Sequence, residues 1–152
     1  MIDHIAHPSY DAAATHRFYS DVLGARLKAA FSGESAEWNA RYLLAAYELE
    51  GAEIDLFTFA GIMRPQPDAL PRDIRHVGLT VPTAPDVARV RGRLDDRGVE
   101  YWLEIRDDGE HLYVTDPNGL VIEFSAAAQP HAGRPDAFDV LRAWIEGAQP
   151  SD

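Results

Sequence analysis

Successive residues of Leu120–Ser125 alternate between an apolar face and a face that carries one acid, and this alternation predicts a strand. Its apolar face consists of Leu120, Ile122 and Phe124. Glu123 falls on the opposite face, because successive side chains of a strand point to opposite sides. The preceding Asp116-Pro117-Asn118-Gly119 is typical of a tight turn, since proline presets φ and Asn-Gly tolerates positive φ. Glu123 is therefore expected in the middle of a strand that returns from a turn.

Residues 75–81 predict an earlier strand that carries a histidine. Its apolar face consists of Val77, Leu79 and Val81. His76 falls on the other face. A helix pattern follows and ends at Gly98, and further strand-like sequence leads to the strand of Glu123. This part of the chain predicts one module with a histidine on its first strand and a carboxylate on its last.

The N-terminal part of the chain repeats this order. Residues 2–6 predict a strand with His4, a helix pattern ends at Gly24, and residues 52–59 predict a strand with Asp55. His4 and Asp55 are 51 positions apart, and His76 and Glu123 are 47 positions apart. Such self-similarity indicates two related modules, each with the order strand, helix and three strands.

The predicted modules comprise residues 1–59 and residues 74–126. The proline-rich residues 60–73 are expected to form a semi-rigid linker, and residues 127–152 a C-terminal tail with a helix. The expected helices are Asp11–Leu23, a helix from Thr83 or Asp86 to Gly98, and Asp136–Glu146. The expected strands, besides those at 2–6, 75–81 and 120–125, are Arg26–Phe31, Ala40–Glu48, Ala52–Phe59, Glu100–Arg106 and His111–Thr115.

Other notable side chains have structural interpretations. An odd separation from His4 points His7 to the opposite face of its strand. His16 lies off the apolar stripe of the first helix, so we expect it in solvent. Three strand aromatics either line a cavity or pack the sheets: Tyr42, Tyr47 and Phe57.

The last predicted helix has an apolar stripe that must cover another surface. The stripe consists of Phe138, Leu141, Trp144 and Ile145. It lies either on the sheet of its own chain or on a second subunit, and it favours a homodimer.

The composition of the 152-residue chain excludes several kinds of binding partner. It has 14 basic and 25 acidic residues and a formal net charge of −11, which argues against nucleic acid or an anionic membrane surface as a partner. The chain has no cysteine, so disulfides and thiolate ligands are excluded. No apolar run is long enough for a membrane span and no signal peptide is evident, so we expect a cytoplasmic protein.

Four segments, together with the order of elements, resemble the vicinal oxygen chelate superfamily. They are Asp3–Ala6, Phe18–Gly24, Ile74–Leu79 and Tyr113–Glu123. The superfamily includes glyoxalase I, methylmalonyl-CoA epimerase, fosfomycin-resistance proteins, extradiol dioxygenases and bleomycin-binding proteins. The resemblance spans roughly residues 1–126. It implies an α+β fold in which two tandem βαβββ modules form a cupped mixed sheet around a metal site, here with an additional C-terminal helix.

The resemblance also implies a set of site residues. His4 and His76 match the imidazole ligands of the metal, and Glu123 matches the carboxylate ligand. Asp55 stands where glyoxalase I has a metal-binding glutamate. Its side chain is one methylene shorter, so Asp55 is a direct ligand, a ligand through water, or a base. The family forms such sites either within one chain or across a dimer, and the sequence leaves both open.

The chemistry of these residue types agrees with the resemblance. Two neutral imidazoles with one or two carboxylates suit Fe(II), Mn, Co, Ni or Zn and leave positions open for substrate oxygens. A divalent metal that holds two adjacent substrate oxygens stabilises an enediolate or catecholate, and Glu123 or Asp55 beside it moves the proton.

Three functions are compatible with this sequence. The first is a lyase or isomerase of glyoxalase or epimerase type, which the presence of Asp55 as a fourth candidate ligand favours. The second is an Fe(II) extradiol-type dioxygenase, for which His111 and Tyr113 are candidates for a further group beside the open site. The third is a non-catalytic antibiotic-binding resistance protein, as in bleomycin resistance, for which intact ligand positions are unnecessary.

Overall fold

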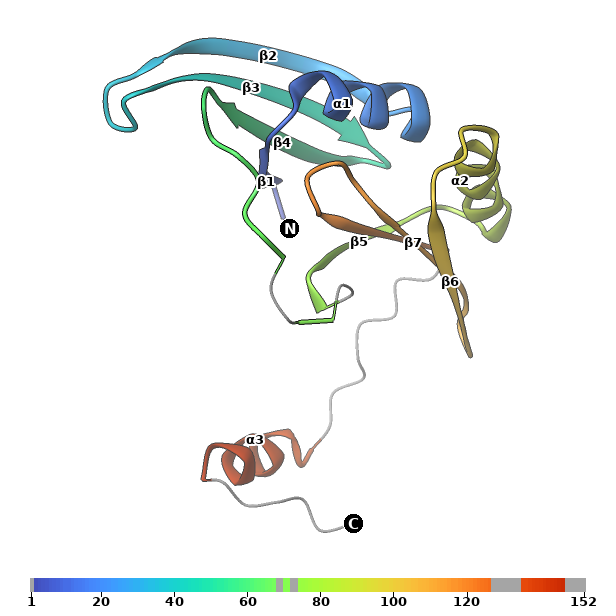
Figure 1. Ribbon diagram of the computed structural model, residues 1–152. Coiled ribbons are helices and arrows are strands. Elements are labelled where there is room, and N and C mark those ends of the chain that lie inside the picture. The colour runs from blue at the N-terminus through green and yellow to red at the C-terminus, as the bar shows by residue number, and fades with distance from the viewer. Residues whose placement is uncertain (1, 68–69, 72–73, 127–134, 147–152) are drawn as a thin grey trace.

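Two similar modules make up most of the chain. The computed structural model describes residues 2–67, 70–71, 74–126 and 135–146 (Figure 1). The predicted tail beyond Ala126 is therefore described only from residue 135 to residue 146, and residues 68–69 and 72–73 of the predicted linker also lie outside the described part.

The first module forms a four-stranded mixed sheet covered by a helix. Its elements are β1 (His4–Ser9), α1 (Ala12–His16), the π-helix η1 (Arg17–Leu23), β2 (Arg26–Ser35), β3 (Ala40–Leu49) and β4 (Ala52–Phe59). The strand order is β1-β4-β3-β2, and β1 pairs with β4 in parallel. The Asp11 carboxylate accepts a hydrogen bond from the Ala14 backbone N–H at 2.9 Å, which caps the first helical turn. Gly24 ends the helical segment in the left-handed conformation, as its lack of a Cβ allows.

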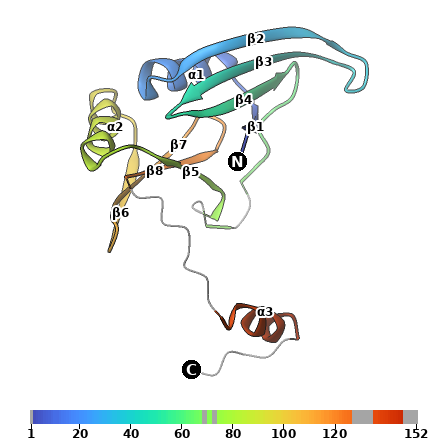
Figure 2. The same cartoon turned by 180° about the vertical axis from the view of Figure 1, so that it is seen from behind.

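The second module repeats this arrangement. Its elements are β5 (His76–Thr80), α2 (Ala84–Asp96), β6 (Tyr101–Arg106), β7 (Gly109–Thr115) and β8 (Val121–Ser125). The strand order is β5-β8-β7-β6, and β5 pairs with β8 in parallel. Figure 2 shows this sheet from behind, with α2 beside it. The observed architecture confirms the predicted α+β fold with two βαβββ units and a C-terminal helix.

The two sheets also share their strand registers. His4 pairs with Glu53, and Ala6 pairs with Asp55. In the second sheet His76 pairs with Val121, and Gly78 pairs with Glu123. In both sheets the acid therefore lies two residues beyond the position opposite the histidine. Residues two apart share a face of a strand, so each module presents its histidine and its acid on one face.

A continuous core joins the modules on their helix-facing sides. It contains Tyr19 and Leu23 from η1 together with Val90 and Leu94 from α2. A buried hydrogen bond also connects the modules: the hydroxyl of Tyr19, in the first module, donates to the carboxylate of Asp116, in the second, at 3.2 Å. The turn that leads into β8 is thus fixed from the first module, and it fixes the start of the strand that carries Glu123.

Some element boundaries differ from those predicted. Strand β2 continues to Ser35, whereas the sequence predicted its end at Phe31. The polar residues from Ser32 to Ser35 stay in the strand because each pairs with a residue of β3. The helix predicted over Asp11–Leu23 consists of a short α-helix and a π-helix. Backbone pairing and helix type are set by tertiary context that local pattern does not record.

The C-terminal helix α3 (Ala137–Ile145) is amphipathic, and none of its residues is buried. Its predicted apolar residues are exposed, including Phe138 and Trp144. Within the described residues, no helix combines the length and apolarity that crossing a membrane requires.

Candidate active site

Glu123 lies at the centre of a row of residues that crosses the second sheet. The register places Trp102, Tyr113, Glu123 and Gly78 next to one another on β6, β7, β8 and β5. Only 8% of Glu123 is exposed. The missing side chain at Gly78 leaves room beside the carboxylate, since a Cβ built there would lie 3.6 Å from Glu123 Oε2.

Both oxygens of the Glu123 carboxylate contact an imidazole. His76 Nε2 lies 2.9 Å from Oε2, and His111 Nδ1 lies 2.5 Å from Oε1. The sequence prediction that His76 and Glu123 share a site is therefore consistent with their contact. The contact of His111 with Glu123 was not predicted.

His111 also contacts a second acid. Its Nε2 lies 2.9 Å from Oδ1 of Asp108, which belongs to the turn between β6 and β7. The His111 side chain is 6% exposed, whereas that of His76 is 36% exposed. The sequence signals for this pair are the turn Asp107-Asp108-Gly109 and a histidine two residues beyond it.

An aromatic and cationic group lies on the other side of Glu123. The Tyr113 hydroxyl accepts a hydrogen bond from Arg106 Nη2 at 2.6 Å and donates one to Glu123. Trp102 stacks on Tyr113, with ring centroids 5.1 Å apart and ring planes 10° apart. Arg106 also donates to Glu104 at 2.6 Å, which neutralises part of its charge.

These contacts shift the acidities of the site. Burial favours the neutral form of Glu123, but hydrogen bonds from His111 and Tyr113 and the charge of the nearby histidines outweigh it and hold the pKa of Glu123 below its ordinary value. For His111, burial alone would lower the pKa, but hydrogen bonds to Asp108 and Glu123 raise it. Burial, followed by the hydrogen bond to Glu123, raises the pKa of Tyr113. Glu123 is therefore ionised near neutral pH, and Tyr113 keeps its proton.

The matching face of the first module is much plainer. The row that contains Asp55 consists of Ala29, Ala46, Asp55 and Ala6. Among the described residues, Asp55 Oδ1 is the one buried side-chain nitrogen or oxygen atom without a hydrogen-bond partner. His4 is about half exposed, and its Nδ1 lies 3.2 Å from Asp3.

The four predicted ligands do not converge within the described part of the chain. No group of three or more His, Asp or Glu side chains among the described residues is arranged to hold a metal ion. His76 and Glu123 touch each other, but His4 and Asp55 do not join them in one group. The prediction of a metal site stays a prediction.

The other histidines and aromatic residues discussed in the sequence analysis have contacts outside the Glu123 cluster. His7 Nδ1 lies 2.9 Å from the Pro8 backbone oxygen, and His16 Nδ1 lies 3.0 Å from the Tyr47 hydroxyl. Tyr47 is 2% exposed and belongs to the core, as the packing interpretation expects. Tyr42 and Phe57 are half-buried and belong to an aromatic cluster with Phe59.

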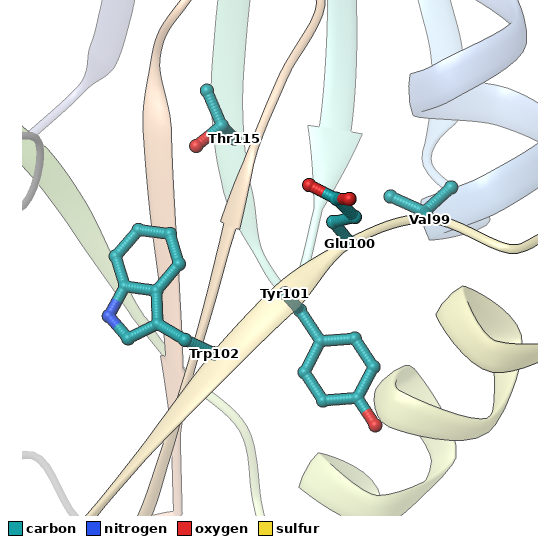
Figure 3. A pocket seen from close by; sticks show the side chains of 5 residues that line it. All are labelled: Val99, Glu100, Tyr101, Trp102 and Thr115. Carbon is teal, nitrogen blue, oxygen red and sulfur yellow. The ribbon is translucent and has the colours of Figure 1, made fainter.

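Two cavities adjoin these faces. A pocket of about 490 Å³ is lined by residues 99–102 and Thr115 (Figure 3). Trp102 lines this pocket and also stacks on the Tyr113 ring, while Tyr101 points towards α2, where its hydroxyl donates to Asp95. A second pocket of about 280 Å³ lies between β1 and β5, and its lining includes His4, Glu53 and Gly78.

A family model decides the evolutionary relationship of the chain. The model of the glyoxalase/bleomycin resistance protein/dioxygenase superfamily matches residues 1–124. The chain belongs to this superfamily. The matched range contains the positions of all four predicted ligands, and the match confirms the resemblance seen in the sequence.

Solved structures of the superfamily share the fold. A glyoxalase family protein from Enterococcus faecalis is 26% identical, with a TM-score of 0.60, and the match covers 82% of this chain and 95% of that one. A variant of the fosfomycin resistance protein FosX from Listeria monocytogenes, solved with Mn(II) and 1S,2S-dihydroxypropylphosphonic acid, is 16% identical with a TM-score of 0.60 over 84% of this chain and 93% of that one. A lactoylglutathione lyase from Agrobacterium tumefaciens is 19% identical with a TM-score of 0.58 over 82% of this chain and 91% of that one. No curated protein sequence matched the chain.

Proposed function

We propose that this superfamily member is a divalent-metal-dependent enzyme of lyase or isomerase type that acts on a small substrate with two adjacent oxygen atoms. The observation that carries the proposal is the shared register of His4 with Asp55 and of His76 with Glu123. Each module thereby presents one imidazole and one carboxylate, which are ligand types that suit Fe, Mn, Co, Ni or Zn.

The surroundings of these residues fit such an ion. Asp55 Oδ1 is buried and unpartnered, and an unpaired buried oxygen carries a desolvation cost that a bound cation would offset. Glu123 is held in its ionised form by hydrogen-bond donors, as a ligand must be. A divalent ion held by His4, Asp55, His76 and Glu123 would stabilise negative charge that develops on neighbouring substrate oxygens.

The protein's own residues supply the rest of the chemistry. Glu123 is ionised and lies beside an open position at Gly78, so its carboxylate adjoins the space in which a substrate carbon would give up a proton and take it back. Trp102 and Tyr113 form a stacked wall on the same face of the sheet, which orients the substrate and excludes water. Two of the similar structures support this chemistry, since one is a lactoylglutathione lyase and the other, a FosX variant, was solved with Mn(II) and a vicinal diol.

The two histidine–carboxylate pairs do not meet within the described chain, and this favours a site shared between two copies. We propose that His4 and Asp55 of one copy complete a site with His76 and Glu123 of a second copy. The exposed apolar residues on the open face of the first sheet, such as Phe31 at 60% exposure, support burial of that face in a dimer.

Mixing two defective variants tests this arrangement. His4→Ala and His76→Ala chains are unfolded together and refolded, and bound Mn²⁺ is counted. In a random mixture half of the dimers contain both variants, and each of these has one intact site, so about a quarter of the wild-type metal content is expected. Each variant refolded alone is the control and is expected to bind almost none. A mixture that binds no more than its components would contradict a shared site.

A screen of the metal-loaded protein tests the reaction class. We expect turnover of 1,2-dioxygenated carbonyl compounds that is lost in Glu123→Ala. The closeness of His111 and Tyr113 to Glu123 supports the dioxygenase alternative. Both ring nitrogens of His111 already contact carboxylates, however, so neither is available to a substrate in this arrangement. Oxygen-dependent ring cleavage of a catechol by the Fe(II)-loaded protein would favour that alternative. A metal-free protein that binds small molecules without turnover would favour the antibiotic-binding alternative.

A further inference from the structure

His111 differs from the other described histidines because it alone is buried. Its ring lies between two carboxylates, with Nδ1 2.5 Å from Glu123 Oε1 and Nε2 2.9 Å from Asp108 Oδ1. Ionised carboxylates only accept hydrogen bonds, so the ring donates from both nitrogens. The two contacts leave the ring no freedom to turn.

This ring fixes one of the two oxygens of Glu123. Oε1 is held by His111, which Asp108 holds from the other side, and Oε2 faces His76 Nε2 at 2.9 Å. A carboxylate binds a cation through one or both oxygens, and the choice depends on what else those oxygens contact. A Glu123 held in this way offers a single oxygen on the His76 side.

The first module has no equivalent device. In the second sheet, His111 pairs with Ser125, which lies two residues beyond Glu123. In the first sheet, the residue two beyond Asp55 is Phe57, and it pairs with Leu44, so Leu44 stands where the second module has His111. Leu44 offers no hydrogen bond, and Asp55 Oδ1 has no partner. The second module therefore holds its acid with a side chain that the first module lacks, so this positioning does not follow from the repeated backbone plan.

We propose that Asp108 and His111 are positioning residues that hold Glu123 Oε1 and present Oε2 alone to a divalent cation and its substrate. The inference rests on the proposed function for the cation, and on the geometry of the chain for the orientation of Glu123. Hydrogen-bond partners of metal ligands commonly alter metal affinity by about 10- to 100-fold when they are removed.

Asp108 provides the test, because it lies in an exposed turn where substitution spares the core. We would compare Asp108→Ala with Asp107→Ala, a matched control that removes the same charge from the neighbouring residue of the turn. Co²⁺ alone is the probe, and its affinity is measured by calorimetry and its coordination by visible absorption. Asp108→Ala is expected to weaken Co²⁺ binding about tenfold or more and to change the absorption spectrum. Asp107→Ala should match the wild type, and Asp108→Asn, which keeps an acceptor oxygen, should lie between them.

Crystal structures of the metal-free variants give a readout that does not depend on the cation. In Asp108→Ala we expect His111 to turn and Glu123 Oε1 to leave its 2.5 Å contact, and in Asp107→Ala we expect the contact to remain. If Asp108→Ala equals Asp107→Ala in Co²⁺ affinity and in the orientation of Glu123, the positioning role is overturned while the proposed function stands. If the wild type binds no Co²⁺, the proposed function fails, and the metal-free structures alone decide the positioning role.

Discussion

The two modules share a backbone plan but differ in what surrounds their acids. Asp55 lies in a row with three alanines, and one of its oxygens is buried without a partner. Glu123 lies in a row with Trp102, Tyr113 and Gly78 and contacts two histidines. The repeat thus fixes where an acid stands, whereas its neighbours decide how firmly it is held.

Under the proposed function, this difference gives the modules different tasks. The second module holds an ionised, oriented carboxylate next to polar and aromatic groups, which suits proton transfer and substrate binding. The first module offers an unsatisfied carboxylate in a small apolar setting, which suits a ligand that is satisfied only when a cation is bound. The predictions below test the contrast at equivalent positions.

The largest expected contrast is in metal affinity. Glu123→Gln is expected to weaken Mn²⁺ binding by more than about 100-fold, because it removes a pre-oriented ligand. Asp55→Asn is expected to weaken it by only about tenfold, because Oδ1 of the shorter side chain is not held by a hydrogen bond. Calorimetric titration with Mn²⁺ measures both. If both variants lost Mn²⁺ affinity to the same extent, the proposed difference in task between the two modules would be contradicted.

The second contrast concerns the stability of the metal-free protein. Glu123→Gln replaces the acceptor of the His111 and Tyr113 hydrogen bonds by a neutral amide, and a cost of about 2–3 kcal/mol in the free energy of unfolding is expected. Urea unfolding checks this value, with Glu100→Gln, at an exposed residue just before β6, as the control of the same chemical change. A loss no larger than that of the control would show that the cluster around Glu123 is not stabilising.

The opposite sign is expected at the equivalent position of the first module. Asp55→Asn removes a charge from a partly buried site with an unpaired oxygen, so the metal-free protein should gain about 1 kcal/mol. The same urea titration applies. A destabilised Asp55→Asn protein would mean that Asp55 has a stabilising partner in solution.

The smallest expected effect is a pH dependence of the network. The pKa of His111 is raised above its ordinary 6.5, so its stabilising contribution is present below pH 6.5 and is lost as the pH rises through the raised value. The pKa of Glu123 is lowered below its ordinary 4.5, so its contribution is present above pH 4.5 and is lost as the pH falls through the lowered value. The difference in unfolding free energy between wild type and His111→Leu should therefore be largest between about pH 4.5 and 6.5. A difference that does not change from pH 4 to 9 would exclude a charged pair.

Much of the fold could be predicted because the local signals agree with one another. The turn at Asp116–Gly119, the glycines that end the helices and the alternation around Glu123 all indicate the elements that form. The contact of His76 with Glu123 was also foreseeable, because two neighbouring strands of one module carry them. The internal repeat extended the same expectation to His4 and Asp55.

The contacts around Glu123 could not be predicted in the same way. The sequence marked His111 and Tyr113 only as possible groups near an open site. Their actual contacts depend on the register of β7 with β8 and on the turn that returns Asp108 to His111. Register and side-chain rotation are decided by packing across the whole sheet, so single-strand patterns do not contain them.

The number of metal ions bound per chain tests the central claim most directly. The account treats the two histidine–carboxylate pairs as halves of one site, so saturating Mn²⁺ followed by elemental mass spectrometry should find about one ion per chain, and either His4→Ala or His76→Ala should abolish tight binding. Two ions per chain, with each substitution removing one, would show two separate sites. No bound ion in the wild type with Fe, Mn, Co, Ni or Zn would contradict the metal-dependent function itself.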